Sequence, residues 1–304
     1  MAIAVTPLTP VFGARVSRVD TNRPLEDGAF AAIRTAFDEH LVPVFSGQPM
    51  TDHQQIAFSE RFGPLEGTAA AGVNPGAGTP FARQSNLDIH SGATISAEDR
   101  RMFYQKANMF WHSDSALKAI PSLCSVLTAQ IVPPQGGATE FASTRAAHAG
   151  LNAAEQARVE DLVVAYDFEY SRGLAGFTFV PGELADVAPV RHRLVRTNMA
   201  NGLKSVMIGA HAKCVAGWPE KESRALLDDL LARVTRPENT YRHDWESGDV
   251  IVWDNQAAVH HATEYDTANH RRLMQRTTIS SGEAGRLGSS LKSFNGLRTA
   301  GRGR

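Results

Sequence analysis

The sequence predicts a mostly β protein with flanking helices, arranged as a double-stranded β-helix, the jelly roll of cupin-like proteins. Short apolar runs bounded by Gly and Pro residues are typical of strands, and segments with helical spacing of apolar residues lie before and between them. Candidate metal ligands, His112, Asp114 and His260, lie in or beside the predicted strands. The chain has 304 residues, and we expect residues 1–281 to form a single domain.

Charge and cysteine content exclude several classes of protein. The formal net charge is −1, with acidic and basic residues interspersed, so no general electrostatic field attracts nucleic acid or a membrane surface. We therefore expect neither as a partner. Cys124 and Cys214 form no C-x-x-C pair, and the N-terminus lacks the features of a signal peptide, which together predict a reduced, cytoplasmic protein. We also expect a homo-oligomer.

The first elements are two helices separated by a short strand. Residues 25–40 place Phe30, Ile33 and Phe37 at helical spacing, and residues 41–45 are β-like. Thr51 and Gln54 have the form of a capping box, which predicts the start of a second helix that ends near Gly63.

A long connection follows this second helix. Residues 66–80 are rich in Gly, Ala, Thr and Pro and show no periodicity. A connection of this length in a compact domain is either an active-site lid or a disordered segment, and both readings stay open. We place the candidate lid at residues 66–105.

The middle of the chain predicts a buried strand and two helices. Residues 125–132 form an apolar run that ends at two prolines, as expected of a strand. Helical segments follow at residues 143–151 and from Asn152, whose capping partner is Glu155.

The last third predicts one more helix and three strands. Pro219 suits a first helical position, and a stripe of leucines at helical spacing follows it. Residues 241–245 and 250–253, joined by a Gly-containing turn, predict a β-hairpin, and residues 272–279 predict another strand. Residues 282–304 have too little apolar content to pack and predict a disordered tail.

The His112-Ser113-Asp114 tripeptide is the strongest chemical signal. If it lies on a strand, His112 and Asp114 share one face. A third ligand must come from elsewhere, and His260 is the best candidate. His261 competes, but adjacent strand residues face opposite ways, so only one of the two histidines can ligate. Two imidazoles and one carboxylate leave three positions open on a non-haem Fe(II), as oxygenases require.

Two arginines near the C-terminus predict an anion site beside this metal. Arg272 and Arg276 share a face if both lie on a strand, whereas Arg271 points outward. Guanidinium groups inside a barrel need anionic partners, and their planar geometry suits carboxylates. Thr139, which follows a Gly-Gly turn, adds a hydroxyl donor.

Together these motifs resemble the Fe(II)/2-oxoglutarate dioxygenases of the taurine dioxygenase family. The resemblance rests on the four motifs His112-x-Asp114, Gly136-Gly137-x-Thr139, Trp253-Asp254-Asn255 followed by His260, and Arg272-x-x-x-Arg276. Further segments, such as Trp111-His112-Ser113-Asp114-Ser115 and Ile208-Gly209-Ala210-His211-Ala212, are most similar to its 2,4-dichlorophenoxyacetate branch. The similarity covers approximately residues 6–281.

The resemblance implies a role for each motif. It implies that His112, Asp114 and His260 bind iron, and that Thr139 and Arg272 bind the distal carboxylate of 2-oxoglutarate. Two more residues, Arg276 and Asn108, are implied to contact the substrate. The family's spacing after Trp253 also selects His260 over His261.

The implied activity is hydroxylation of a small acidic substrate, with O2 as oxidant and release of succinate and CO2. An aryloxyalkanoate is the expected substrate, and hydroxylation of a carbon bearing the ether oxygen would cleave the ether. This chain has no lysine between Glu66 and Tyr104, where the herbicide-degrading branch has lid lysines, so we expect weaker turnover of the herbicide itself. The alternatives are a sulfonate or sulfate ester dioxygenase, a zinc hydrolase and a non-catalytic binding module.

Overall fold

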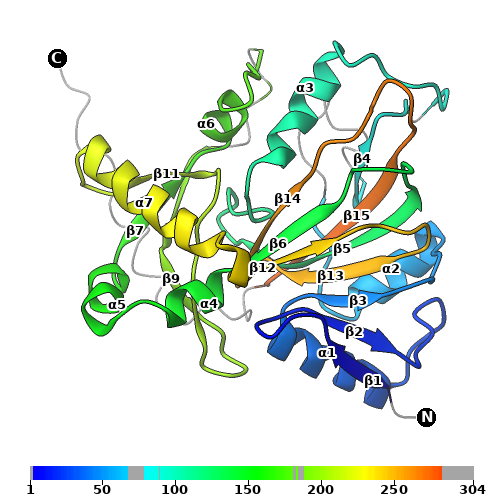
Figure 1. The fold of residues 1–304 in the computed structure, drawn as a ribbon, viewed down its shortest axis with the longest axis horizontal. Helices are drawn as coiled ribbons and strands as arrows, with labels where there is room; N and C mark the ends of the chain where they lie inside the picture. Colours follow the sequence, from blue (N-terminus) through cyan, green and yellow to red (C-terminus); the bar gives the residue numbers. More distant parts are fainter. Residues whose placement is uncertain (1–2, 68–78, 89, 181–182, 184–187, 283–304) are drawn as a thin grey trace.

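The computed structural model describes residues 3–67, 79–88, 90–180, 183 and 188–282, and it consists mostly of β-sheet with helices around it (Figure 1). The predicted mostly β composition with flanking helices is therefore confirmed. Among the described residues, every helix is too short or too polar to cross a lipid bilayer. The predicted tail lies outside the described residues apart from Gly282, as does most of the Gly- and Ala-rich part of the predicted lid.

Two sheets form the part of the structure that carries the candidate site. The larger has seven strands, all antiparallel to their neighbours except β2 and β3. In spatial order they are β1 (Ala4–Pro7), β2 (Ala14–Ser17), β3 (Pro43–Phe45), β13 (Val250–Asp254), β5 (Ser122–Ile131), β15 (Leu273–Ser280) and β4 (Phe81–Ser85). The smaller sheet contains β12 (Thr240–His243), β6 (Thr139–Ser143) and β14 (Ala258–Ala262).

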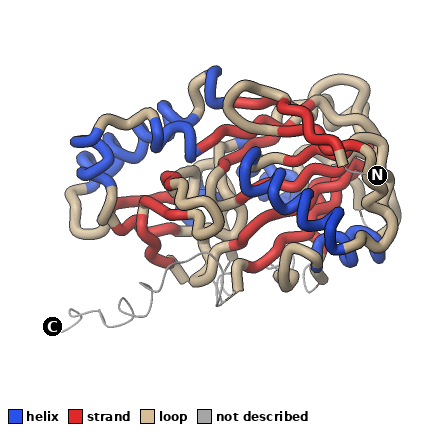
Figure 2. Tube along the Cα trace, turned by 90° about the horizontal axis from the view of Figure 1, so that it is seen from below, coloured by secondary structure: helices blue, strands red, loops and turns tan. Residues whose placement is uncertain are grey.

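Side chains of β13 alternate between two hydrophobic cores, as the strand geometry requires. Val250 and Val252 pack in a core with helices α1 (Asp27–His40) and α2 (Asp52–Glu60), whereas Ile251 and Trp253 pack in a second core with Phe141 of β6. Figure 2 shows α1 lying across the strands of the large sheet. The seven-stranded sheet therefore lies between a helical layer and the smaller sheet.

The remaining elements form a third core beside the two sheets. It contains two small sheets, β11 (Ala212–Val215), β7 (Val163–Tyr166) and β8 (Val190–Arg193) in one, and β10 (Lys204–Val206) and β9 (Val195–Thr197) in the other. The helices here are α4 (Thr144–Ala149), α5 (Ala153–Val159) and α7 (Glu220–Val234). The predicted leucine stripe of α7 supplies three leucines and Val234 to this core, which confirms its interpretation as core packing.

Four shorter elements complete the described chain: α3 (Arg100–Lys106), η1 (Ala107–Met109), α6 (Phe168–Gly173) and η2 (Pro237–Asn239). The helices predicted from the two capping boxes are confirmed, because Thr51 and Asn152 both cap in the reciprocal way. Pro219 is the N-cap of α7 and not its first helical residue, since its ψ of 142° is extended. Within the residues predicted as a lid, β4 belongs to the edge of the large sheet.

The predicted hairpin of residues 241–253 is wrong. β12 pairs with β6, whereas β13 pairs with β3 and β5, so the two strands belong to different sheets. The intervening turn carries the chain from one sheet to the other and is fixed by Asp249, whose carboxylate accepts from His243 Nε2 at 2.9 Å and from Glu246 N at 3.1 Å. Alternation and turn residues predict strands, but they do not specify which strands pair.

Candidate metal and anion site

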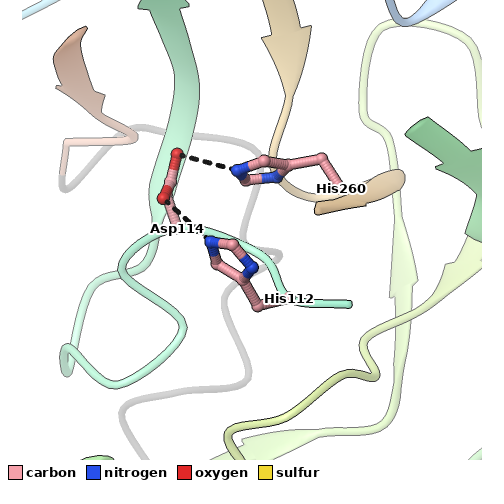
Figure 3. Close-up of side chains that lie close together, drawn as sticks. All are labelled: His112, Asp114 and His260. Atoms are coloured by element: carbon pink, nitrogen blue, oxygen red, sulfur yellow. Dashed lines mark ion pairs between the residues drawn. The ribbon is translucent and has the colours of Figure 1, made fainter. Parts of the chain in front are cut away.

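The three predicted metal ligands meet at one buried point (Figure 3). The ligating atoms of His112, Asp114 and His260 all lie within 4.8 Å of one another. Nε2 of His112 is 3.9 Å from Asp114 Oδ1, and Nε2 of His260 is 3.9 Å from Asp114 Oδ2. Each side chain therefore turns one donor atom toward a common centre.

His112 and Asp114 do not lie on a regular strand, contrary to the sequence prediction. His112 forms an isolated antiparallel bridge with His260 of β14, in which each backbone N–H donates to the other residue's carbonyl at 3.0 and 2.8 Å. The chain then turns at Asp114. Ser113 Oγ and the backbone N–H of Asp114 both donate to Asn255. These two hydrogen bonds stabilise the turn, where a regular strand would have ladder hydrogen bonds instead.

Close backbone approach at Gly209 is needed for this bridge. Gly209 has φ of +133°, and a Cβ there would lie 3.0 Å from both His112 Cα and the carbonyl oxygen of Trp111. The N–H of Ala210 donates to that same carbonyl at 2.8 Å. Only glycine allows the segment before β11 to support the His112 backbone from behind.

Both histidines are neutral and have nitrogen lone pairs available. His112 Nδ1 donates to the carbonyl of Phe110 at 2.8 Å, which leaves Nε2 unprotonated toward Asp114. Burial lowers the pKa of His112 to about 4 and that of His260 well below its usual range. Both ring nitrogens of His260 are buried without a hydrogen-bond partner among the described residues. A divalent metal ion would satisfy Nε2 of His260, the ring nitrogen that faces Asp114.

Asp114 is held ionised within a chain of hydrogen bonds. Its Oδ2 accepts from Ser125 Oγ at 2.7 Å, and Ser125 Oγ accepts from Asn255 Nδ2 at 2.9 Å. Asn255 Oδ1 in turn accepts from Trp253 Nε1 at 2.8 Å. Burial raises the pKa of Asp114, but Arg276 and the two histidines lower it to about 2. The Trp-Asp-Asn motif therefore orients this carboxylate.

His261 points away from this centre. Its Nε2 lies 2.9 Å from Glu140 Oε2, and the side chain is only partly buried. The alternation of strand side chains thus separates His260 from His261, as the sequence analysis expected.

Thr139 lines a small cavity beside His260, and Arg272 is connected to this cavity through Gln84. Gln84 also lines this cavity, and Thr139 Oγ1 accepts from Trp245 Nε1 at 3.0 Å. Arg272 is buried, and its guanidinium donates only to the carbonyls of Gln84, at 3.5 Å, and of Gly137, at 3.3 Å. Its Nε has no partner among the described residues, and burial lowers its pKa to about 10. The side chain is therefore a buried cation that lacks a carboxylate partner in the described chain.

Arg276 lies on β15 and lines a larger cavity together with His112 and Asp114. The Nη1 group of Arg276 donates to Asp114 Oδ1. Arg272 precedes the first residue of β15, and the ladder with β5 shifts register after Leu273, so the predicted regular spacing of the two arginines is interrupted. Arg276 lines the larger cavity, whereas Arg272 contacts Gln84 at the smaller one, and His112 lines both cavities.

Asn108 lines both cavities, but it is engaged by a residue that the sequence analysis missed. Asn108 Oδ1 lies 3.4 Å from Nη1 of Arg172, a buried arginine of α6. The larger cavity is also lined by Phe168, His211 and Lys118. The sequence analysis placed His211 only in a family-like motif. No sequence spacing connects Phe168 and Arg172 to the proposed metal ligands, because α6 reaches the site only through tertiary packing.

Comparisons with known proteins agree on one family. The model of the taurine catabolism dioxygenase TauD, TfdA family matches residues 4–278. The α-ketoglutarate-dependent 2,4-dichlorophenoxyacetate dioxygenase of Cupriavidus pinatubonensis is 36% identical over 282 residues, which cover 92% of this chain and 98% of the relative. The (S)-phenoxypropionate/α-ketoglutarate-dioxygenase of Sphingobium herbicidovorans is 35% identical over 285 residues, covering 91% and 95%.

A solved structure extends this similarity to the fold. The crystal structure of AAD-2 in complex with Mn(II) and N-oxalylglycine superposes with a TM-score of 0.84 at 37% sequence identity. The match covers 92% of this chain and 97% of that chain.

Proposed function

Because the chain belongs to the taurine catabolism dioxygenase TauD, TfdA family, we propose that the buried cluster described above is the iron centre of an aryloxyalkanoate dioxygenase. The chain is a 2-oxoglutarate-dependent dioxygenase that acts on aryloxyalkanoate-type acids. Fe(II), 2-oxoglutarate and O2, when bound, supply the oxidising power that hydroxylates a substrate C–H bond and yields succinate and CO2.

In this proposal His112, Asp114 and His260 hold the iron on one face. The single observation that carries the assignment is the buried, unpartnered Nε2 of His260 beside an ionised carboxylate. Two neutral imidazoles and one carboxylate match the ligand set of non-haem Fe(II) oxygenases. The bridge between His112 and His260 fixes their relative position, and Asn255, through Ser125, fixes that of Asp114.

Thr139 and Arg272 bind the distal carboxylate of 2-oxoglutarate in this proposal. A buried guanidinium without a carboxylate partner in the described chain is costly unless an anion binds there, and its planar donors suit a carboxylate. Thr139 contributes a hydroxyl from the wall of the cavity next to His260. The co-substrate would then lie in the smaller cavity, which is lined by both proposed histidine ligands.

Arg276 and Asn108 contact the substrate in the larger cavity. Tyr104, Phe168 and Leu117 give this cavity apolar walls that fit an aromatic ring, and Arg276 provides a cation for the acid group. Lys118 lines the same cavity from outside the predicted lid, but it is bound to Glu66 at 2.7 Å. A small aromatic body with one acidic group is the best match.

Assays with a panel of phenoxyacetate, phenoxypropionate and taurine would test this assignment. We expect one succinate per oxidised aryloxy acid, and phenol release wherever the hydroxylated carbon bears the ether oxygen. A higher kcat/KM for taurine than for both aryloxy acids would contradict the substrate assignment while leaving the dioxygenase activity intact.

At the level of the fold, we propose that the seven-stranded sheet and the β12–β6–β14 sheet are the two sheets of a double-stranded β-helix in one domain. The alternation of side chains between the helical layer and the facing sheet supports this arrangement. The proposed iron ligands then lie at the open end between the sheets.

A further inference from the structure

Arg172 is a buried cation on the wall of the larger cavity. Only 8% of the residue is exposed, and its guanidinium carbon lies 4.2 Å from the ring centroid of Tyr104 and 5.1 Å from that of Phe168. Its Nη1 donates to the Tyr104 carbonyl at 2.8 Å and, at 3.4 Å, to Asn108 Oδ1. Its Nε is buried without a partner among the described residues.

The other charged groups that line this cavity are paired. Lys118 binds Glu66 at 2.7 Å, and Arg276 binds Asp114. Arg172 forms no ion pair with any described carboxylate, so its positive charge is the unbalanced one in the described lining of the cavity. Two aromatic rings and a backbone carbonyl stabilise the guanidinium, but they do not neutralise it.

Such an arrangement is costly in the absence of an anion. A buried charge without a counter-charge loses its hydration, and only a partner with well-placed acceptors compensates this loss. Both rings, which meet edge to face with their centroids 6.3 Å apart, pack against the guanidinium and restrict its orientation, so little side-chain entropy is lost when an anion binds.

We propose that Arg172 is a further substrate-binding residue that, together with Arg276, binds the carboxylate of an aryloxyalkanoate and selects acids over neutral aryl ethers. This inference rests on the proposed function. Asn108, besides its proposed contact with the substrate, would also help to position Arg172, because its side-chain oxygen accepts from Arg172. Tyr104 and Phe168 pack against the Arg172 guanidinium, and they also line the cavity in which the aromatic ring of the substrate would bind.

Arg172 offers a cleaner test of charge recognition than Arg276. Arg276 is hydrogen-bonded to a proposed iron ligand, so its removal also disturbs the metal site. Arg172 makes no hydrogen bond or ion pair with His112, Asp114 or His260.

Binding of phenoxyacetate and of neutral phenoxyethanol is measured by calorimetry on protein loaded with Mn(II) and N-oxalylglycine, which permits no turnover. A hydrogen bond to a charged group contributes about 1.5–3 kcal/mol, so we expect Arg172→Gln to weaken phenoxyacetate binding by roughly 10- to 100-fold. Phenoxyethanol binding should change by less than about threefold, because no charge is recognised. Arg172→Lys should weaken phenoxyacetate alone, and it serves as the second test if the glutamine variant does not fold.

The matched control is Arg100→Gln. Arg100 also stacks on an aromatic ring, that of Phe177 at 4.6 Å, but it is partly exposed and paired with Glu183. Its loss should leave both affinities unchanged. Equal weakening of the acid and the alcohol in the Arg172 variants, or no weakening of the acid, would overturn the inference. If the unsubstituted protein fails to bind Mn(II) and N-oxalylglycine, the proposed iron site itself is contradicted.

Discussion

Individual side chains of the site are set by burial and by the few hydrogen bonds that burial permits. Neutral imidazoles at His112 and His260 follow from their pKa values, which burial lowers. The ionised carboxylate of Asp114 follows from Arg276 and from the hydroxyl of Ser125. Arg272 and Arg172 are also buried, and neither forms an ion pair with a described carboxylate. Each guanidinium therefore indicates a place where an anionic ligand can bind.

At this scale we predict that Arg272→Ala raises the KM for 2-oxoglutarate by roughly 10- to 1000-fold, because a buried charged contact contributes a few kcal/mol. Titration of 2-oxoglutarate at saturating substrate measures this effect. Arg271→Ala is the control, since Arg271 is the exposed neighbour and its loss should leave the KM unchanged. A KM effect in the Arg271 variant alone would show that the face of this segment is misassigned.

The proposed metal ligands and Arg272 could be singled out from the sequence because their motifs occur together and in a consistent order. None of these motifs is specific alone, since a carboxylate two residues after a histidine also arises by chance. Arg172 has no such signal, since its role depends on α6 packing against α3, two segments about seventy residues apart. Sequence patterns reveal local periodicity, but they do not reveal a contact between two helices that are distant in the sequence, such as that of Arg172 with Tyr104.

At the scale of secondary structure, the site depends on one irregular bridge. His112 is joined to β14 by two backbone hydrogen bonds, and Gly209 supports it from the other side. The chain around Asp114 turns where the sequence predicts a strand, because Asn255 satisfies its polar groups. The two helices with capping boxes, α2 and α5, were predicted well, whereas α3 and α6 were not predicted. The pairing of β12 and β13 was predicted wrongly, since pairing is set by distant strands.

We predict that Gly209→Ala lowers both stability and metal affinity. The added Cβ would lie 3.0 Å from His112 Cα and would force the bridge apart. Gly217→Ala is the matched control, since Gly217 also has a positive φ, +80°, but its Cβ would meet nothing within 4 Å. Backbone strain alone costs about 1–2 kcal/mol for a non-glycine residue in the left-handed region near Gly217, and at least as much at Gly209, whose φ of +133° lies outside that region. Urea unfolding and Mn(II) titration of the two variants would separate strain from displacement, and equal metal affinity in both would contradict the role of Gly209.

At the scale of the whole molecule, the site exists only when distant strands are assembled. Ser125 lies on β5, His260 on β14 and Arg276 on β15, and all three act on the environment of Asp114. The sheets supply these side chains from segments separated by up to 151 positions in the sequence, counted from Ser125 to Arg276 (276 − 125). Metal binding should therefore stabilise the whole fold, because the unfolded chain holds no such site.

The most direct test of the account is anaerobic Fe(II) binding to the unsubstituted protein, His260→Ala and His261→Ala, followed by succinate formation in the same preparations. We predict one Fe(II) per chain and full 2-oxoglutarate turnover for the unsubstituted protein and for His261→Ala. His260→Ala should lose both, because its removal leaves two ligands on an otherwise unchanged fold. Retention of iron and turnover by His260→Ala, with their loss in His261→Ala, would contradict the account.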